Sequence, residues 1–220
     1  QSKDWNRGKY LVEGAGHCSA CQAPRNLLGA ETGTMSGAVI DGWYAPPLAG
    51  DTPAQRGWSV DSLTAYLRTG HAPDRASASG PMAEVVDSLT ALPDADISAM
   101  ATYLATLVTP DVAPTPAPAE ADLPPTPESR LFRAACASCH TPGLADTFTA
   151  AQVTLGRSMA VRAPTIEPLT SVIRDGIAAP LSLPLRDMPG FGGELSDPQI
   201  DSLARYLRAR FAPDLPAWPH

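Results

Sequence analysis

The sequence predicts a mainly α-helical protein built from two similar domains in tandem. Each half of the chain shows the same order of features: a helix, a pair of cysteines, a long loop, a short helix, a methionine segment and a last helix. The stretch between the halves is rich in proline and alanine, which is typical of a semi-rigid, extended linker. We therefore place a first domain at residues 1–108, a linker at 109–126 and a second domain at 127–220.

The last helices of the two halves show the repeat most clearly. In both, apolar residues recur at the spacing of one helix face. These residues are Ile97, Met100, Tyr103 and Leu104 in the first helix, and Ile200, Leu203, Tyr206 and Leu207 in the second. One constant offset aligns all four pairs, so we predict an internal duplication and a core position for Met100.

Local signals place the elements of the first domain. We expect a helix over residues 5–20, a loop-rich stretch to about residue 57, a short helix between Ser59 and Gly70, and a last helix from Asp94 or Asp96 to Leu107. Serine is a favoured helix N-cap, and glycine readily ends a helix. The same signals therefore predict both ends of the short helix.

The second domain follows the same plan. We expect a first helix that begins at Thr126-Pro127-Glu128, a short helix that begins at Thr170 or Ser171, and a last helix from Ser196 to Phe211. Threonine before proline is a capping residue followed by a proline that is tolerated in the first turn. Leu131, Phe132 and Ala135 would form the inner face of the first helix.

The clearest functional motif is Cys136-Ala-Ser-Cys139-His140, at the end of that first helix. Two thiols on one helical turn can each form a thioether to the edge of a porphyrin, and the adjacent imidazole can reach its iron. This order is typical of a c-type haem attachment site. The alternatives are a disulfide, half of a zinc site, or a redox dithiol, which would need alternating strands and helices around it.

The first domain has the same cysteine spacing at Cys18 and Cys21, but Gln22 stands where the histidine would follow. Its amide oxygen is a weak, neutral donor beside an imidazole. His17 faces the wrong way for ligation, because consecutive helix residues point about 100 degrees apart. Three interpretations stay open: a haem with altered ligation, a domain that has lost its haem and serves for docking, or an engineered loss of one redox centre.

A methionine follows each short helix, in a loop that contains proline. We expect Met82 and Met188 to reach across as sixth iron ligands, although a methionine taken alone is more often core filler. If the first iron has altered ligation, Met82, water or an inward-turned His71 could supply it. We expect His71 otherwise to be exposed to solvent.

The composition agrees with a protein built around a cofactor. The 220 residues include only four Phe, four Trp and five Tyr, and 24 prolines, so two small domains could bury only modest apolar cores. A covalently held macrocycle would supply the missing interior. A net charge of -7 argues against a nucleic-acid partner. No apolar run reaches the roughly 18 residues of a membrane span.

Cysteine pairs that carry haem belong to the oxidising side of a bacterial membrane. Gln1 begins no signal peptide, so we expect a mature or trimmed periplasmic form. Any association with the membrane would then depend on a partner or on a segment outside this sequence.

The two halves resemble two class I cytochrome c domains, in which the first and last helices cross and the haem lies between the cysteine helix and the methionine loop. Several segments are similar to multihaem cytochrome subunits of periplasmic alcohol and sugar dehydrogenases and molybdenum hydroxylases. These segments are residues 6–21, 23–26, 43–48, 80–82 and 188–191. Members of this family often have three haem domains, and the chain matches the last two.

The resemblance implies a ligand set for the second domain. Cys136 and Cys139 would hold haem c, and His140 and Met188 would bind its iron. Pro142 would lie near the histidine, where a backbone carbonyl could orient the ring.

For the first domain the resemblance implies a similar but incomplete set. Cys18 and Cys21 match the attachment pair, and Met82 matches the sixth ligand. Arg25 and Trp43 are candidate contacts of the haem propionates, Trp43 through its indole N–H. The residue after Cys21 departs from the family pattern.

The function implied is electron transfer from a dehydrogenase catalytic subunit to a downstream redox partner, without bond chemistry in this chain. Histidine and methionine ligation fills both axial positions of the iron and raises its potential. The alternative is a dihaem enzyme of the peroxidase or sulfur-compound oxidase type, with an open iron position. The first domain, however, offers no clear set of acid and base groups for such an enzyme. A third possibility is one working haem, with the first domain used for docking.

Overall fold

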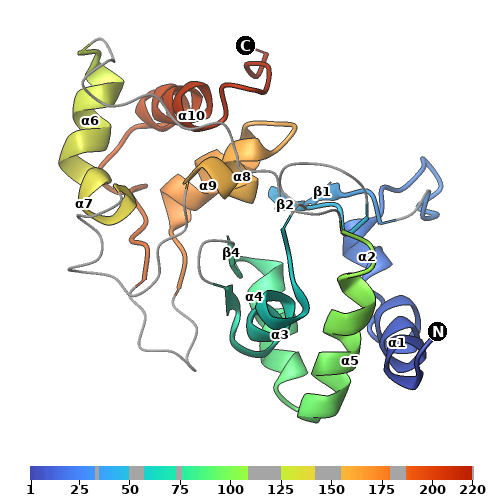
Figure 1. The fold of residues 1–220 in the computed structure, drawn as a ribbon. Coiled ribbons are helices and arrows are strands. Elements are labelled where there is room, and N and C mark those ends of the chain that lie inside the picture. The colour runs from blue at the N-terminus through green and yellow to red at the C-terminus, as the bar shows by residue number, and fades with distance from the viewer. Residues whose placement is uncertain are drawn as a thin grey trace. The chain divides into compact units, whose positions relative to one another are not determined.

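The computed structural model describes residues 1–32, 35–49, 57–72, 76–108, 125–141, 155–178 and 187–219. Within these ranges the chain is mainly helical, and it divides into two compact units, residues 1–113 and 114–220 (Figure 1). Each unit has a hydrophobic core of its own. Most of the expected linker, residues 109–124, lies outside the described residues, as does Pro142.

The first unit contains helices and two short hairpins. In chain order its elements are α1 (Lys3–Lys9), the π-helix η1 (Tyr10–Ala15), α2 (Ser19–Gln22), β1 (Ala38–Ile40), β2 (Trp43–Ala45), α3 (Val60–Thr69), β3 (His71–Ala72), β4 (Ala76–Ser77), α4 (Pro81–Leu89) and α5 (Asp94–Leu104). The strands pair antiparallel, β1 with β2 and β3 with β4. Loops were expected at both places, because strands this short carry no period-two pattern.

The single helix expected over residues 5–20 is wrong. Helix α1 passes into η1, and the chain then leaves the helix at Gly16 before α2 begins at Ser19. A π-helix has wider turns than an α-helix, so it accommodates an extra residue. His17 adopts a left-handed backbone with φ of 48°, which redirects the chain towards Cys18.

Helices α1 and α5 cross at close range (Figure 1). A Cβ atom added at Gly8 would lie 1.9 Å from the Ala99 carbonyl oxygen, so only glycine permits this approach. Arg7 donates two hydrogen bonds of 2.8 Å to Asp96 across the crossing. Met100 of α5 is buried, which confirms its predicted core position.

The short helix of the first unit confirms its predicted ends. Ser59 caps α3 in a capping box with Ser62, and Gly70 ends the helix in the left-handed region. Helix α5 begins at Asp94, after Pro93, and ends at Leu104. The expected end at Leu107 was therefore three residues too late, because residues 105–107 form turns.

The second unit has helices only, apart from one isolated β-bridge, among the residues described. Its elements are α6 (Pro127–Ala135), α7 (Ala137–His140), the 3₁₀-helix η4 (Leu155–Arg157), α8 (Met159–Arg162), α9 (Glu167–Asp175) and α10 (Asp197–Phe211). The predicted caps Thr126 and Ser196 are confirmed. Helix α9 begins at Glu167, before the expected Thr170, because Pro168 fits its first turn.

The core of the second unit forms where α6 packs against α10 (Figure 1). Phe132, Ile200 and Leu203 are almost completely buried there. These residues belong to the helix faces that the apolar spacing predicted. The crossing of the first and last helices is therefore present in each unit by itself.

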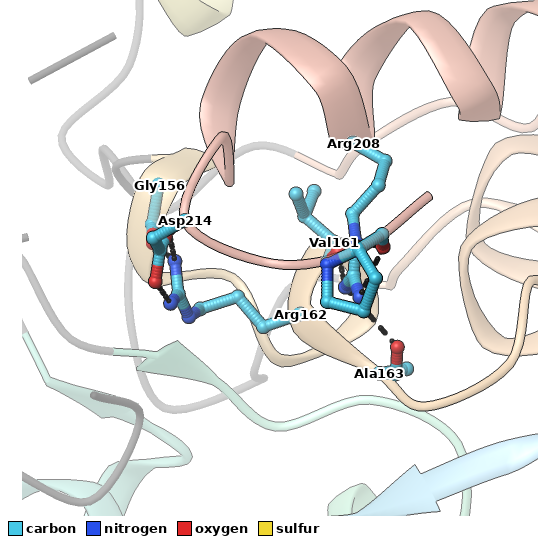
Figure 2. A network of polar contacts seen from close by, with 7 residues as sticks. Gly156, Val161, Arg162, Ala163, Arg208 and Asp214 are labelled. Carbon is cyan, nitrogen blue, oxygen red and sulfur yellow. Dashed lines mark hydrogen bonds and ion pairs between the residues drawn. The ribbon is translucent and has the colours of Figure 1, made fainter. Parts of the chain in front are cut away.

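Buried arginines fasten the segment after α10 to α8. Figure 2 shows Arg162 pointing at the Asp214 carboxylate, and Arg208 pointing at the carbonyl oxygens of Val161 and Ala163. The two bonds from Arg208 measure 2.8 and 3.2 Å. A buried guanidinium needs such acceptors, since burying a charge without partners is costly.

Candidate haem-binding sites

The cysteine motif of the second unit lies on one tight turn. Cys136 ends α6, and the single turn α7 carries Cys139 and His140. The amide groups of Cys139 and His140 donate to the Cys136 carbonyl oxygen at 3.1 and 3.0 Å. This turn places both thiols and the imidazole within one short element, as covalent attachment of a haem requires.

The state of these thiols distinguishes the alternatives. Both cysteines are free, Cys136 half-buried and Cys139 exposed. Burial, with a smaller contribution from neighbouring Cys139, raises the pKa of Cys136 to about 11. A reactive redox cysteine has a lowered pKa instead. The described residues also contain no group of three or more His, Cys, Asp or Glu side chains able to hold a metal ion, as a zinc site would need.

The Nδ1 atom of His140 is buried. Pro142, whose carbonyl was expected to orient this ring, lies outside the described residues. Its role therefore stays a prediction.

Met188 lies in an extended segment that is held by the backbone. Its N–H and carbonyl groups form 2.9 Å hydrogen bonds with Ile177, directly after α9. Gly176 has φ of +76°, and a Cβ atom there would lie 2.3 Å from the Met188 carbonyl oxygen. Glycine is therefore required where the chain turns to meet the methionine. Met188 itself is half-buried.

The cysteine turn of the first unit has the same backbone. Cys18 is half-buried, Cys21 is exposed, and both are free. The amide groups of Cys21 and Gln22 donate to the Cys18 carbonyl oxygen at 3.4 and 3.0 Å, as their counterparts do in the second unit. Burial also raises the pKa of Cys18. The turn is thus preserved even though its last residue is a glutamine.

The Gln22 side chain has an unusual environment. Its Oε1 atom is buried and has no hydrogen-bond partner in the part of the chain that the structure describes. A buried acceptor without a partner costs about 1–3 kcal/mol. A group bound at this turn would remove that cost, so the residues present fit an iron-bearing ligand.

Met82 does not lie in a loop, which corrects the expectation from the sequence. It is in the first turn of α4, half-buried, and it packs against the first core. Gly80 precedes it with φ of +52°, and a Cβ atom there would lie 2.4 Å from the Trp43 ring. Trp43 therefore supports the backbone that leads to Met82, and a contact with a propionate stays a prediction. Gly-Pro followed by helix-forming residues was a start signal that could have revealed α4.

Two further predicted residues have clear positions. His71 is buried, and its Nδ1 atom lies 3.0 Å from the Ser77 hydroxyl, so the expected exposure is wrong. Pairing of β3 with β4 covers it. Arg25 donates to the carbonyl oxygens of Gly29 and Ala20 at 2.7 and 3.0 Å and thereby braces its own loop.

An open cavity of about 540 Å³ lies between η1 and α4, and no sequence pattern had indicated it. Its walls are mainly apolar and include Leu11, Val85 and Met100. Gly16 also lines it, and a Cβ atom on Gly16 would lie 3.6 Å from the Cys18 sulfur. An apolar ligand attached at Cys18 would therefore have apolar surface beside it.

None of the helices in the described residues is both long enough and apolar enough to cross a membrane.

Comparison with known proteins adds three relatives. A nicotinate dehydrogenase chain of Pseudomonas putida, the second of that enzyme's subunits by name, is 41% identical over 99% of this chain, which spans 19% of that relative. The fructose dehydrogenase cytochrome subunit of Gluconobacter japonicus is 48% identical over 46% of this chain and 21% of its own length. A dihaem c-type cytochrome of Cereibacter sphaeroides is 44% identical over 44% of this chain and 33% of its own length.

The chain thus spans about a fifth to a third of the length of these relatives. Residues 125–207 match the family model described as cytochrome c oxidase, cbb3-type, subunit III. This match confirms the predicted cofactor, haem c with iron. It also explains the cysteine turn, the crossing helices and the pinned methionine of the second unit as parts of one fold. Residues 125–207 therefore form a c-type cytochrome domain, in a chain homologous to the cytochrome subunits of dehydrogenases.

Proposed function

We propose that the chain is the dihaem part of a periplasmic dehydrogenase subunit, which takes electrons from the catalytic subunit and passes them to a downstream redox partner. The cysteine turn carries this proposal, because it occurs twice with the same backbone hydrogen bonds. The similarity over 99% of the chain to a dehydrogenase subunit supports a shared function for both units.

In this proposal both units are cytochrome c domains, separated by the proline-rich residues 109–126. Cys136 and Cys139 hold the second haem, and His140 and Met188 bind its iron. When bound, haem c supplies a one-electron iron couple. The protein contributes the ligands and the surrounding apolar core, which exclude water and set the potential.

The residues of the second unit are arranged to hold these ligands still. Hydrogen bonds to the Cys136 carbonyl fix the turn that carries His140. Two backbone hydrogen bonds to Ile177 fix the position of Met188 along the chain. A rigid ligand set changes little between two oxidation states, and a small rearrangement is what rapid electron transfer needs.

The first unit would hold its haem through Cys18 and Cys21. The apolar cavity beside Cys18 and the buried Oε1 atom of Gln22 support a bound group there. Gln22 also motivates the second candidate, in which the first unit has no haem and serves for docking.

The number of haems per chain tests the proposal. We expect two, measured by alkaline pyridine haemochrome absorbance against an independent protein concentration, with intact mass as the check on covalent attachment. A value of one would favour the docking candidate. Reduction of the purified cytochrome by its catalytic subunit and substrate would test the direction of electron flow. A failure of both haems to be reduced would contradict electron transfer from that partner.

A further inference from the structure

We propose that the Gln22 side chain binds the iron of the first haem directly, through its amide oxygen Oε1. This inference rests on the proposed presence of a haem in the first unit. It adds the identity of the fifth ligand, which neither the cysteine motif nor the relatives' names supply.

The backbone places Gln22 where the second unit has its histidine. Gln22 and His140 each follow the second cysteine, and each amide donates to the carbonyl oxygen of the first cysteine at 3.0 Å. The two side chains therefore leave equivalent turns at equivalent positions. A glutamine side chain and a histidine side chain also have comparable reach from Cα to their terminal donor atoms.

The side chain of Gln22 is prepared for a ligand. Its Oε1 atom is buried and lacks a hydrogen-bond partner among the described residues, although most buried polar atoms are satisfied. Meanwhile the backbone is held on both sides, since the Gln22 carbonyl accepts a 2.7 Å hydrogen bond from Gly37. A cation bound at Oε1 would satisfy the one acceptor of this residue that the described part of the protein leaves open.

The neighbouring histidines are less suitable. His17 is exposed, and its left-handed backbone belongs to the bend before Cys18. His71 is buried in β3, with its Nδ1 atom at hydrogen-bonding distance from the Ser77 hydroxyl. Gln22 is thus the residue whose place on the cysteine turn and whose open acceptor both favour iron binding.

An amide oxygen is a harder and weaker-field donor than an imidazole nitrogen, so the ligand has a spectroscopic signature. We expect the oxidised protein to contain one high-spin ferric haem and one low-spin haem. Gln22→His should convert the first haem to low spin. Gln22→Glu keeps an oxygen donor at the same reach and should keep the high-spin state.

The decisive comparison uses the full chain, with haem content measured for each variant. Gln22→Leu removes the donor, so added imidazole no longer has to displace it. Imidazole, followed by absorbance and electron paramagnetic resonance, should then bind the first haem about tenfold more tightly than in the wild type. His17→Asn is the matched control, since asparagine tolerates the left-handed backbone, and it should leave spin state and imidazole affinity unchanged.

The outcomes separate this inference from the proposed function. Two haems per chain, with equal imidazole affinity in wild type and Gln22→Leu, would overturn Gln22 as the ligand and leave the dihaem function intact. Two haems with a low-spin first haem in the wild type would overturn it as well. One haem per chain in the wild type would instead contradict the dihaem function, and the inference with it.

Discussion

The two cysteine turns share a backbone but differ in what surrounds them. In the second unit a regular helix, α6, runs straight into Cys136. In the first unit the π-helix η1 and a left-handed His17 intervene before Cys18. The hydrogen bonds inside the two turns are nevertheless alike. The two units thus share the geometry that presents the thiols and differ in the approach and in the last residue.

The methionine segments differ in a similar way. Met188 is extended and pinned to Ile177 by two backbone hydrogen bonds. Met82 is in the first turn of a helix, behind a glycine that lies against Trp43. A shared order of motifs along the chain therefore does not guarantee the same structure around each methionine. The second site has the stronger candidate ligand and the more rigid backbone.

Removal of the thiols should have the largest effect. We expect Cys136→Ala with Cys139→Ala, and separately Cys18→Ala with Cys21→Ala, each to lower the haem content from two per chain to one. The reason is that thioether attachment needs the sulfur atoms. Pyridine haemochrome absorbance and intact mass measure the loss. An unchanged haem content in the first-unit variant would break the equivalence of the two turns.

The next effect concerns the ligand methionine. Met188→Ala should lower the potential of the second haem by on the order of 0.1 V, because thioether ligation stabilises ferrous iron. Any weak far-red charge-transfer band should disappear with it. Potentiometric titration followed by visible absorbance measures both changes. Met82→Ala provides the comparison, and a Met188 variant with wild-type potential would remove this residue from the ligand set.

The glycine before Met82 allows a test of stability. Gly80→Ala places a Cβ atom 2.4 Å from the Trp43 ring at a left-handed φ. It should lower the free energy of unfolding of the first unit by about 1–3 kcal/mol. Gly193→Ala is the control, because no heavy atom lies within 4 Å of its Cβ position. Urea unfolding followed by circular dichroism compares them. Equal midpoints would show that Trp43 moves aside without cost.

The smallest effect is expected at the ion pair after α10. Arg162 lowers the pKa of Asp214 mainly through a hydrogen bond, so the folded state binds a proton less readily than the unfolded state. The stabilisation is therefore present above the unfolded pKa of about 3.9 and is lost as the pH falls through the lower, folded value.

Asp214→Asn should cost on the order of 1 kcal/mol at neutral pH, and less at pH ~3. Thermal unfolding at the two pH values measures the difference. Asp96→Asn, in the exposed pair with Arg7, serves as the counterpart in the first unit and should change stability less, because solvent screens it. A loss for Asp214→Asn that grows as the solution is acidified would contradict the assigned cause.

Strong local signals were enough to predict several helices from the residues alone. The capped helices α3, α6 and α10 begin where serine or threonine predicted, and the apolar faces of the last helices form the cores. Capping and periodicity act over a few neighbouring residues, so they can be recognised without knowing the fold. The haem motif is equally local, since two thiols and an imidazole on one turn need only their spacing.

The surroundings of the sites, in contrast, depend on how distant segments pack. Burial of His71 depends on the pairing of β3 with β4, and the position of Met82 depends on a helix that packs against the first core. The open acceptor of Gln22 likewise reflects which residues lie around it. Burial and hydrogen-bond satisfaction are properties of contacts between distant segments, which spacing along the chain does not encode.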